Sequence, residues 1–279
     1  MSPGVFAAVL VAALMHAGWN ATLKVKLDPL AAMTLVTVGS GVLALPFLFV
    51  FGVPRAESWP WLLASVALHL AYYFTLSEAY RRADMGQVYP IARGGAPLLT
   101  TLGGLLVLRE PLPPAALAGI AVLGGGVMLM ALGGRTARLD VRALGYAALT
   151  ALVISGYTLS DGSGARAAGD PHAYSAALFV INAVPLPAIL AARHGTAYLR
   201  PLLAHPGIAL GGGGMSLAAY SIAIWAMTVA PVALVAALRE TSVLFAAVIA
   251  TTVLREPWRP VRIAASVLIL LGLAATRLG

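Results

Sequence analysis

The sequence contains 38 consecutive residues, from 201 to 238, without a single aspartate, glutamate, lysine or arginine. A helix needs only about 20 apolar residues to cross a bilayer, so this stretch is long enough for two helices. Thr228-Val229-Ala230-Pro231 is the natural turn between them, because the residue before a proline is disfavoured in a helix. The stretch therefore predicts a membrane protein whose helices are joined by short connections.

The composition of the whole chain agrees with this prediction. Charged residues make up 10% of the 279 residues and the mean hydropathy is +0.90, whereas soluble domains carry roughly 25% charged residues. The net charge of +8 is spread singly or in pairs between apolar segments, which is typical of topology signals and not of a nucleic-acid surface. The absence of cysteine excludes disulfides, thiolate metal sites and thiol nucleophiles.

Charged and turn residues divide the chain into ten apolar segments, so we expect an all-α integral membrane protein with ten transmembrane helices. We expect the first segment to remain as a helix, since it lacks the basic start of a cleavable signal. The expected spans are 3–23, 30–52, 58–80, 85–108, 112–133, 142–160, 172–192, 206–229, 231–254 and 259–277.

An internal repeat organises these segments. Val107-Leu108-Arg109-Glu110-Pro111 recurs 146 residues later as Val253-Leu254-Arg255-Glu256-Pro257, and the same offset carries Arg93 onto Arg239. We therefore expect two five-helix units, residues 1–133 and 142–279, joined by a linker at 134–141. An odd number of helices per unit makes the second unit insert upside down, which predicts inverted repeats around a central cavity.

The positive charges support the inversion, because equivalent loops of the two units have opposite charge bias. Adding the loops on each side gives 12 cations on one face of the membrane and four on the other. Cytoplasmic loops carry the excess of lysine and arginine. We therefore expect both termini on the non-cytoplasmic side.

Arg93 and Arg239 are the candidate substrate-binding cations. Each is the ninth residue of its expected span, deep enough that an unpartnered arginine would cost at least about 2.5–3.5 kcal/mol. One hypothesis is that a guanidinium binds a carboxylate in the cavity. The alternative is a structural role, in which the side chain reaches the interface or bonds to backbone carbonyls.

Other polar and aromatic side chains inside the spans complete the candidate site. Glu240 points about 100° away from its neighbour Arg239 around the helix, so it could pair across helices, receive an ammonium group or carry a proton. Glu78 is expected instead to form an interfacial ion pair with Arg81 and Arg82. The predicted substrate-binding residues are His16, Trp19, Asn20, Tyr73, Tyr89, Arg93, Tyr157, Trp225, Arg239 and Glu240.

Motifs of known catalytic chemistry are absent from the sequence. It contains no His-Glu-x-x-His, no Gly-x-Ser-x-Gly and no Walker loop, and its five histidines lack ligand spacing. Gly162-Ser163-Gly164 is expected in a short loop without a partner base. We therefore expect no catalytic residue, metal or cofactor, and a membrane-embedded enzyme is the less favoured class of function.

These features together resemble a known family. Two five-helix halves that close on Leu-Arg-Glu-Pro, with His16-Ala17-Gly18-Trp19-Asn20 in the first helix and Tyr89-Pro90-Ile91-Ala92-Arg93 in the fourth, resemble the drug/metabolite transporter superfamily. Within it, the chain is similar to EamA-type carriers, most closely to the YddG-like amino-acid exporters. The second half departs from the first, with Tyr157 and Thr158 in place of Trp19 and Asn20.

The resemblance implies a cavity formed mainly by helices 1, 3, 4, 6, 8 and 9 and alternating access between the halves. It also implies export of amino acids across the bacterial inner membrane, with the lipid bilayer and a small-molecule substrate as partners. Since one fused chain contains both orientations, a monomer is expected. Carriers of cationic drugs or nucleotide sugars are the alternatives within the superfamily.

Overall fold

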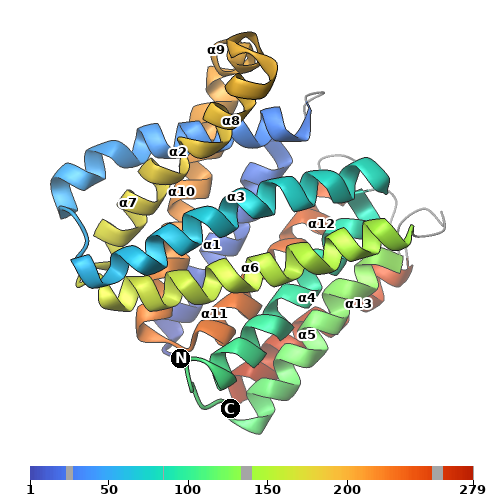
Figure 1. Ribbon diagram of the computed structural model, residues 1–279. Helices are drawn as coiled ribbons and strands as arrows, with labels where there is room; N and C mark the ends of the chain where they lie inside the picture. Colours follow the sequence, from blue (N-terminus) through green and yellow to red (C-terminus); the bar gives the residue numbers. More distant parts are fainter. Residues whose placement is uncertain (23–27, 84, 133–139, 253–259, 279) are drawn as a thin grey trace.

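The computed structural model describes residues 1–22, 28–83, 85–132, 140–252 and 260–278, and all regular structure in these ranges is helical (Figure 1). The second Arg-Glu-Pro motif at 255–257 lies outside the described residues. So do Lys24, Lys26 and most of the expected linker at 134–141.

Five long helices fill the first half of the chain, and a short 3-10 helix, η1 (Ala56–Ser58), precedes the third. They are α1 (Pro3–Thr22), α2 (Pro29–Phe51), α3 (Trp59–Arg82), α4 (Met85–Leu106) and α5 (Pro114–Leu132). The start of α2 shows why they begin where they do. Asp28 accepts a hydrogen bond from the backbone N–H of Leu30 at 3.0 Å, and Pro29 fills the first helical position.

The second half of the chain is divided into more and shorter helices than the first half. Its helices are α6 (Val141–Ala167), α7 (Pro171–Asn182), α8 (Pro185–His194), η2 (Thr196–Leu199), α9 (Arg200–Ala204), α10 (Pro206–Val229), α11 (Val232–Arg239), α12 (Ser242–Thr252) and α13 (Pro260–Leu278). The segment formed by α8, η2 and α9 projects from one end of the bundle (Figure 1).

Eight segments of the described chain are long and apolar enough to cross a membrane, which supports a multi-pass membrane protein. The pairs α7–α8 and α11–α12 each count as one of these segments. Helix α5 offers only a shorter apolar stretch, Pro114–Met130, and α4 carries Arg93. Ten spans therefore remain a prediction.

The sixth span was expected to end at residue 160, and this is wrong. Helix α6 continues to Ala167, so Gly162-Ser163-Gly164 is helical and does not form a loop. Asp161 suggested an end because a charge is costly inside a membrane. The structure instead buries this side chain completely and gives it hydrogen-bond donors.

Two spans that were expected to be continuous are interrupted. The seventh breaks before Pro185, because proline has no backbone N–H to donate to the preceding turn. The ninth is interrupted at Glu240-Thr241 by a 3-10 turn, in which backbone hydrogen bonds span three residues instead of four. The Glu240 N–H, for example, donates to the Ala237 carbonyl at 3.1 Å. Such tight turns inside a helix often mark functional positions, and this one directly follows Arg239.

The helices pack across the two halves of the chain. Helix α3 packs along α6, α1 along α10, α4 along α6, and α5 along α13. Both termini lie close together at the same end of the bundle, which we call the terminus face (Figure 1). The connections between α2 and α3, α4 and α5, and α6 and α7 lie at this face, because successive helices run in opposite directions.

A close crossing of α2 and α10 depends on glycine. The Ser40 hydroxyl of α2 donates to the Gly213 carbonyl of α10 at 3.0 Å, and a Cβ atom on Gly213 would lie 2.5 Å from the Ser40 backbone nitrogen. Small residues allow this approach, which is the usual basis of helix association in lipid. Glycine at position 213 is therefore a packing residue of this crossing.

We expect Gly213→Ala to lower the stability of the detergent-solubilised protein by about 1–3 kcal/mol, since the added methyl group forces the two backbones apart. Gly211→Ala is the matched control, because it lies in the same helix with open space at its Cβ position. Thermal unfolding of both variants checks the prediction. An equal effect of the two substitutions would contradict it.

Polar contacts also fix the end of the bundle opposite the terminus face. Glu78 pairs with Arg81 at 2.7 Å and with Arg82 at 3.3 Å, which confirms the expected interfacial ion pairs. The Tyr198 hydroxyl of η2 donates to Asp28 at 2.7 Å. Partial burial and this hydrogen bond raise the pKa of Tyr198 to about 12, so the hydroxyl remains a donor at neutral pH.

Candidate functional site

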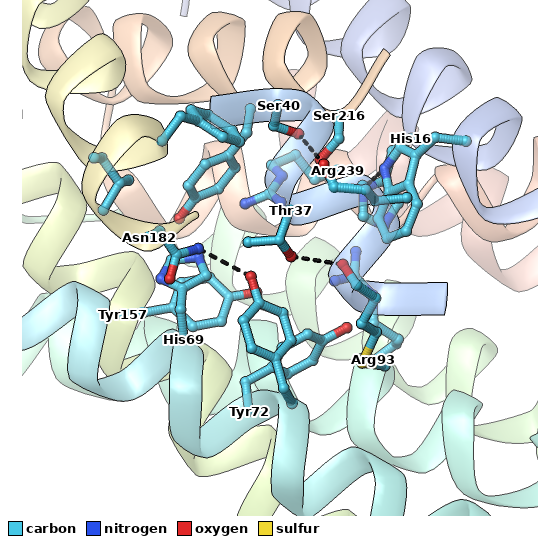
Figure 2. A pocket seen from close by; sticks show the side chains of 17 residues that line it. His16, Thr37, Ser40, His69, Tyr72, Arg93, Tyr157, Asn182, Ser216 and Arg239 are labelled. Atoms are coloured by element: carbon cyan, nitrogen blue, oxygen red, sulfur yellow. Dashed lines mark hydrogen bonds between the residues drawn. The ribbon is translucent and has the colours of Figure 1, made fainter. Parts of the chain in front are cut away.

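A cavity of about 90 Å³ lies among α1, α2, α3, α4, α6, α7, α10 and α11 (Figure 2). This is space for several water molecules. All six helices that the resemblance implied line the cavity, if α10 and α11 are counted as the eighth and ninth spans. Helices α2 and α7 also contribute lining residues. Six of the ten predicted site residues line it: His16, Trp19, Tyr73, Arg93, Tyr157 and Arg239.

The cavity lies away from the terminus face. Its lining comes from the last turns of α1, the first half of α2 and the middle of α3. Toward the terminus face, the helices around the cavity pack into an apolar core. Met227 of α10 and Val232 and Val235 of α11 belong to this core and are each 0% exposed. The cavity floor is therefore separated from that face by tightly packed side chains.

Arg239 is the last residue of α11, immediately before the 3-10 turn. Its guanidinium lies 4.5 Å from the centre of the Tyr220 ring, a cation–π contact. Within the described ranges, no carboxylate pairs with this guanidinium and no oxygen accepts a hydrogen bond from it. The side chain lines the cavity (Figure 2), so its donors are available to a bound anion.

Arg93, in contrast, has a carboxylate partner. Its Nη2 atom lies 2.9 Å from Glu240 Oε1, and the two side chains are only 3% and 5% exposed. Of the three roles considered for Glu240, pairing across helices is therefore the one observed. The ion pair connects α4 of the first half to the turn between α11 and α12 of the second half.

The rest of the cavity wall is largely aromatic. The His69 ring stacks on Tyr157 with centroids 4.1 Å apart, and Tyr72 and Tyr220 meet Tyr157 edge-on at 6.0 and 6.1 Å. Phe179 continues the wall at 6.2 Å from Tyr220. These rings provide an apolar surface with phenol hydroxyls and one imidazole as polar points.

The polar side chains of α1 form contacts within their own helix. The Trp19 indole N–H donates to His16 Nδ1 at 3.2 Å, which leaves Nε2 of a neutral His16 as the protonated ring nitrogen. The Asn20 amide donates to the His16 carbonyl at 2.8 Å. Asn20 is therefore bonded along its own helix and does not line the cavity.

Three further predicted residues also lie outside the cavity lining. Tyr89 lies under the Arg93 guanidinium, with 6.0 Å to the ring centre, and Trp225 packs against the main apolar core. Glu240 is held by Arg93 as described above. Tyr89 and Glu240 thus surround a cation of the site, and Trp225 belongs to the core.

The structure adds lining residues that were not predicted as site residues. His69 and Tyr220 belong to the aromatic wall, and Ser216 lies on α10 one helical turn before Tyr220. Asn182 of α7 donates to the Tyr73 hydroxyl at 2.9 Å. The aromatic residues gave a sequence signal, since they lie inside spans, but Ser216 and Asn182 carry no pattern that separates them from ordinary helix contacts.

A second polar cluster lies at the terminus face, and we call it the clasp. It consists of Glu110 at the end of α4, Arg166 at the end of α6 and the backbone between α10 and α11. The Arg166 guanidinium lies 2.5 Å from one Glu110 carboxylate oxygen and donates to the Met227 carbonyl at 2.9 Å. The other Glu110 oxygen accepts from the Val232 backbone N–H at 2.9 Å.

The repeated Leu-Arg-Glu-Pro motif positions the clasp. Arg109 takes a left-handed conformation with φ 53°, a position that usually holds glycine after a helix. The following backbone N–H, of Glu110, donates to the Gly104 carbonyl at 3.0 Å. This turn ends α4 and directs the Glu110 side chain toward α6 and α11, so the motif joins the first half to the second.

Among the described residues, no three histidine, aspartate or glutamate side chains gather in a way that could hold a metal ion. The Ser65 hydroxyl lies 3.1 Å from Nδ1 of the cavity-lining His69, but Ser65 itself does not line the cavity. The geometry thus describes a binding cavity that contains cations and aromatic rings.

Comparisons with known proteins identify a type of family and a fold. Residues 2–132 match the EamA-like transporter family, which indicates a membrane transporter of the drug/metabolite transporter type. No curated protein sequence matches the chain. One solved crystal structure superposes with a TM-score of 0.76 at 19% identity, over 98% of this chain and 95% of that chain. At this identity the likeness shows a common fold.

Proposed function

We propose that this protein is a secondary transporter that exports amino acids and related small metabolites, as the YddG-like branch of EamA-type carriers does. The observation that carries the proposal is the difference between the two arginines. Arg93 is neutralised by Glu240 at 2.9 Å, whereas Arg239 faces the cavity without a carboxylate partner among the described residues. A guanidinium in this setting favours a carboxylate ligand.

The other cavity walls fit the remainder of an amino acid. Its side chain would lie against the rings of Tyr157 and Phe179, and its ammonium group would meet phenol hydroxyls and the Asn182 amide oxygen. The described lining contains two arginines and no carboxylate, and one of the arginines is paired with Glu240. The net charge of the cavity is therefore positive.

The alternatives within the superfamily fit less well. A cationic drug would favour a carboxylate in the cavity, but Glu240 is 3% exposed and paired, and Glu78 lies at a helix end with two arginines. A nucleotide sugar carries two linked phosphate groups, but only one guanidinium of the described cavity lining is without a carboxylate partner. The charges of the cavity therefore favour a small zwitterion.

Helix contacts support two inverted five-helix units in the proposed ten-helix layout, in which α4 and α5 also cross the membrane. A two-fold axis in the membrane plane would relate the two units, so each contact between them would occur in two equivalent copies. A contact of the third helix of the first unit with the first helix of the second unit then implies the reverse contact as well. The pairs α3–α6 and α1–α10 are these two contacts, with α10 as the eighth span. The pairs α4–α6 and α1–α12 correspond in the same way.

Alternating access requires a closed face and an open face, and we assign the closed face to the clasp. Glu110 and Arg166 join the two units at the terminus face, while the cavity lies toward the opposite face. We place the protein in the bacterial inner membrane as a monomer, with the cation-rich face and the cavity toward the cytoplasm and both termini outside. Opening toward the outside would then require the clasp to separate.

We expect Glu110→Gln to open the terminus face more often, because it removes the ionic contact to Arg166. The chain has no cysteine, so Ala233→Cys, 1% exposed in α11, introduces a unique reporter behind the clasp. A small water-soluble thiol reagent should modify this cysteine several-fold faster in the Glu110→Gln background. Glu57→Gln, on the exposed η1 of the same face, is the control. Equal rates in all three backgrounds would show that the clasp does not close this face.

A counterflow panel on reconstituted protein tests the proposed function. Proteoliposomes loaded with an unlabelled amino acid should transiently accumulate the labelled amino acid, whereas vesicles loaded with sugars or organic cations should not. Competition by a carboxylate-free amine of the same amino acid should be weak, because Arg239 would lack its ligand. Flat time courses for every amino acid would contradict the proposal.

A further inference from the structure

Asp161 is a buried carboxylate that the proposed binding of substrate does not use. It lies in the second half of α6 and is 0% exposed. Its two oxygens accept hydrogen bonds from two tyrosine hydroxyls, Oδ1 from Tyr174 at 3.0 Å and Oδ2 from Tyr220 at 2.5 Å. In the part of the chain that the structure describes, no lysine or arginine forms a salt bridge with Asp161.

The two tyrosine hydroxyls can form hydrogen bonds with Asp161 whether its carboxyl group is ionised or protonated. Ionised Asp161 accepts hydrogen bonds from the two phenol O–H groups, while protonated Asp161 can still accept one of them and has one O–H to donate. A metal ion fits poorly, because both carboxylate oxygens already face hydrogen-bond donors and too few acceptor oxygens surround the position.

Tyr220 connects this carboxylate to the substrate cavity. The ring lines the cavity, its hydroxyl reaches Asp161, and its face carries the Arg239 guanidinium at 4.5 Å. A proton can therefore pass from cavity water to Asp161. In this relay, Tyr220 gives its hydroxyl proton to Asp161 Oδ2 and takes one from a hydronium ion in the cavity, which becomes water, so that no charge remains on the phenol.

The surroundings of Asp161 contain few other charges. Four helices that pack on α6 contribute titratable groups, and among the described residues the nearby full positive charge lies across the Tyr220 ring. These groups are His69 of α3, Tyr174 of α7, Tyr220 of α10, Arg239 of α11 and, on α6 itself, Tyr157. Asp161 is thus the carboxylate that a proton would reach from this side of the cavity.

We propose that Asp161 is a proton-binding site and that its proton is carried together with the substrate. This inference rests on the proposed transport of a carboxylate-bearing substrate at Arg239. Ionised Asp161 lowers the positive potential at Arg239, and protonation removes that effect. A unit charge about 10 Å away changes the affinity for an anion by about tenfold at an effective dielectric constant near 20.

The sign of the coupling follows from this electrostatic effect. Protonated Asp161 favours the substrate carboxylate at Arg239, and bound substrate favours protonated Asp161, because linkage is reciprocal. Proton and substrate therefore cross in the same direction. Export by this route requires an outward substrate gradient that exceeds the inward proton gradient.

Proteoliposomes with equal internal and external pH first test whether counterflow occurs, independently of protons. An external acid pulse should then raise the accumulation of a labelled amino acid several-fold in wild-type vesicles. In Asp161→Asn, the ratio of accumulation with and without the pulse should fall to one. Asp140→Asn is the matched control, since asparagine also caps α6 well and Asp140 is exposed.

A second measurement covers the case in which Asp161→Asn does not fold. A pH-sensitive dye inside wild-type vesicles should report acidification when an inward amino-acid gradient is imposed. Counterflow without this acidification would overturn the proton site, as would an acid response that is equal in wild type and Asp161→Asn. Absence of counterflow at equal pH would instead count against the transport function itself.

Discussion

Replacement of Arg239 by alanine is expected to lower kcat/KM for amino-acid transport by about 100-fold, because about 3 kcal/mol of charge-assisted hydrogen bonding to the substrate carboxylate is lost. Folding should be affected little, since no ion pair of the described structure depends on Arg239. Arg239→Lys should recover part of the activity, because an ammonium keeps the charge but not the planar, bidentate geometry.

The measurement is initial uptake into proteoliposomes that contain equal amounts of each variant. Arg193→Ala, an exposed arginine at the end of α8, serves as the control for loss of a cation. If Arg239→Ala retained transport within a few-fold of wild type, the substrate carboxylate would have to bind elsewhere, and Arg93 would be the remaining cation of the cavity.

The Arg93–Glu240 pair should show the largest effect on stability. Glu240→Ala leaves a guanidinium that is 3% exposed without its carboxylate, and removal of one partner of a buried pair costs about 3–5 kcal/mol. Arg93→Ala should be costly for the same reason, because it strands the glutamate. Thermal unfolding in detergent measures both variants, and Glu78→Ala, at a partly exposed position near a helix end, should change stability by about 0.5 kcal/mol or less.

A double substitution distinguishes a stabilising pair from two independent effects. Arg93→Met combined with Glu240→Met replaces the ions with apolar side chains, an exchange that is often neutral for buried pairs. We expect the double variant to be more stable than either alanine variant alone. Strict additivity of the single effects would show that the two side chains do not interact in the folded protein.

Much of the fold was predictable because lipid imposes simple rules on a sequence. Helix starts at Pro29, Pro171 and Pro206 agree with expected segment starts to within one residue, since proline favours the first helical position, and Asp28 and Asp170 also cap the first two of these helices. The end of α6 was missed because the rule that charges end spans fails when a charge has buried donors, as Asp161 has.

The candidate site was less predictable than the fold. The repeat identified Arg93 and Arg239 as equivalent, yet one is paired and the other faces the cavity. This difference arises from contacts between distant helices, such as Glu240 of the second half reaching Arg93 of the first. Residue periodicity describes the face of one helix, and it carries no information about which face of another helix lies opposite.

The central claim is that a substrate carboxylate occupies the cavity beside Arg239, and cysteine protection tests it most directly. Ser216→Cys places the chain's sole thiol on the cavity wall, since the natural sequence has none. A saturating amount of a transported amino acid should slow its modification by a small thiol reagent several-fold, and Arg239→Ala should abolish this protection. A modification rate that does not change when the amino acid is added would contradict the account.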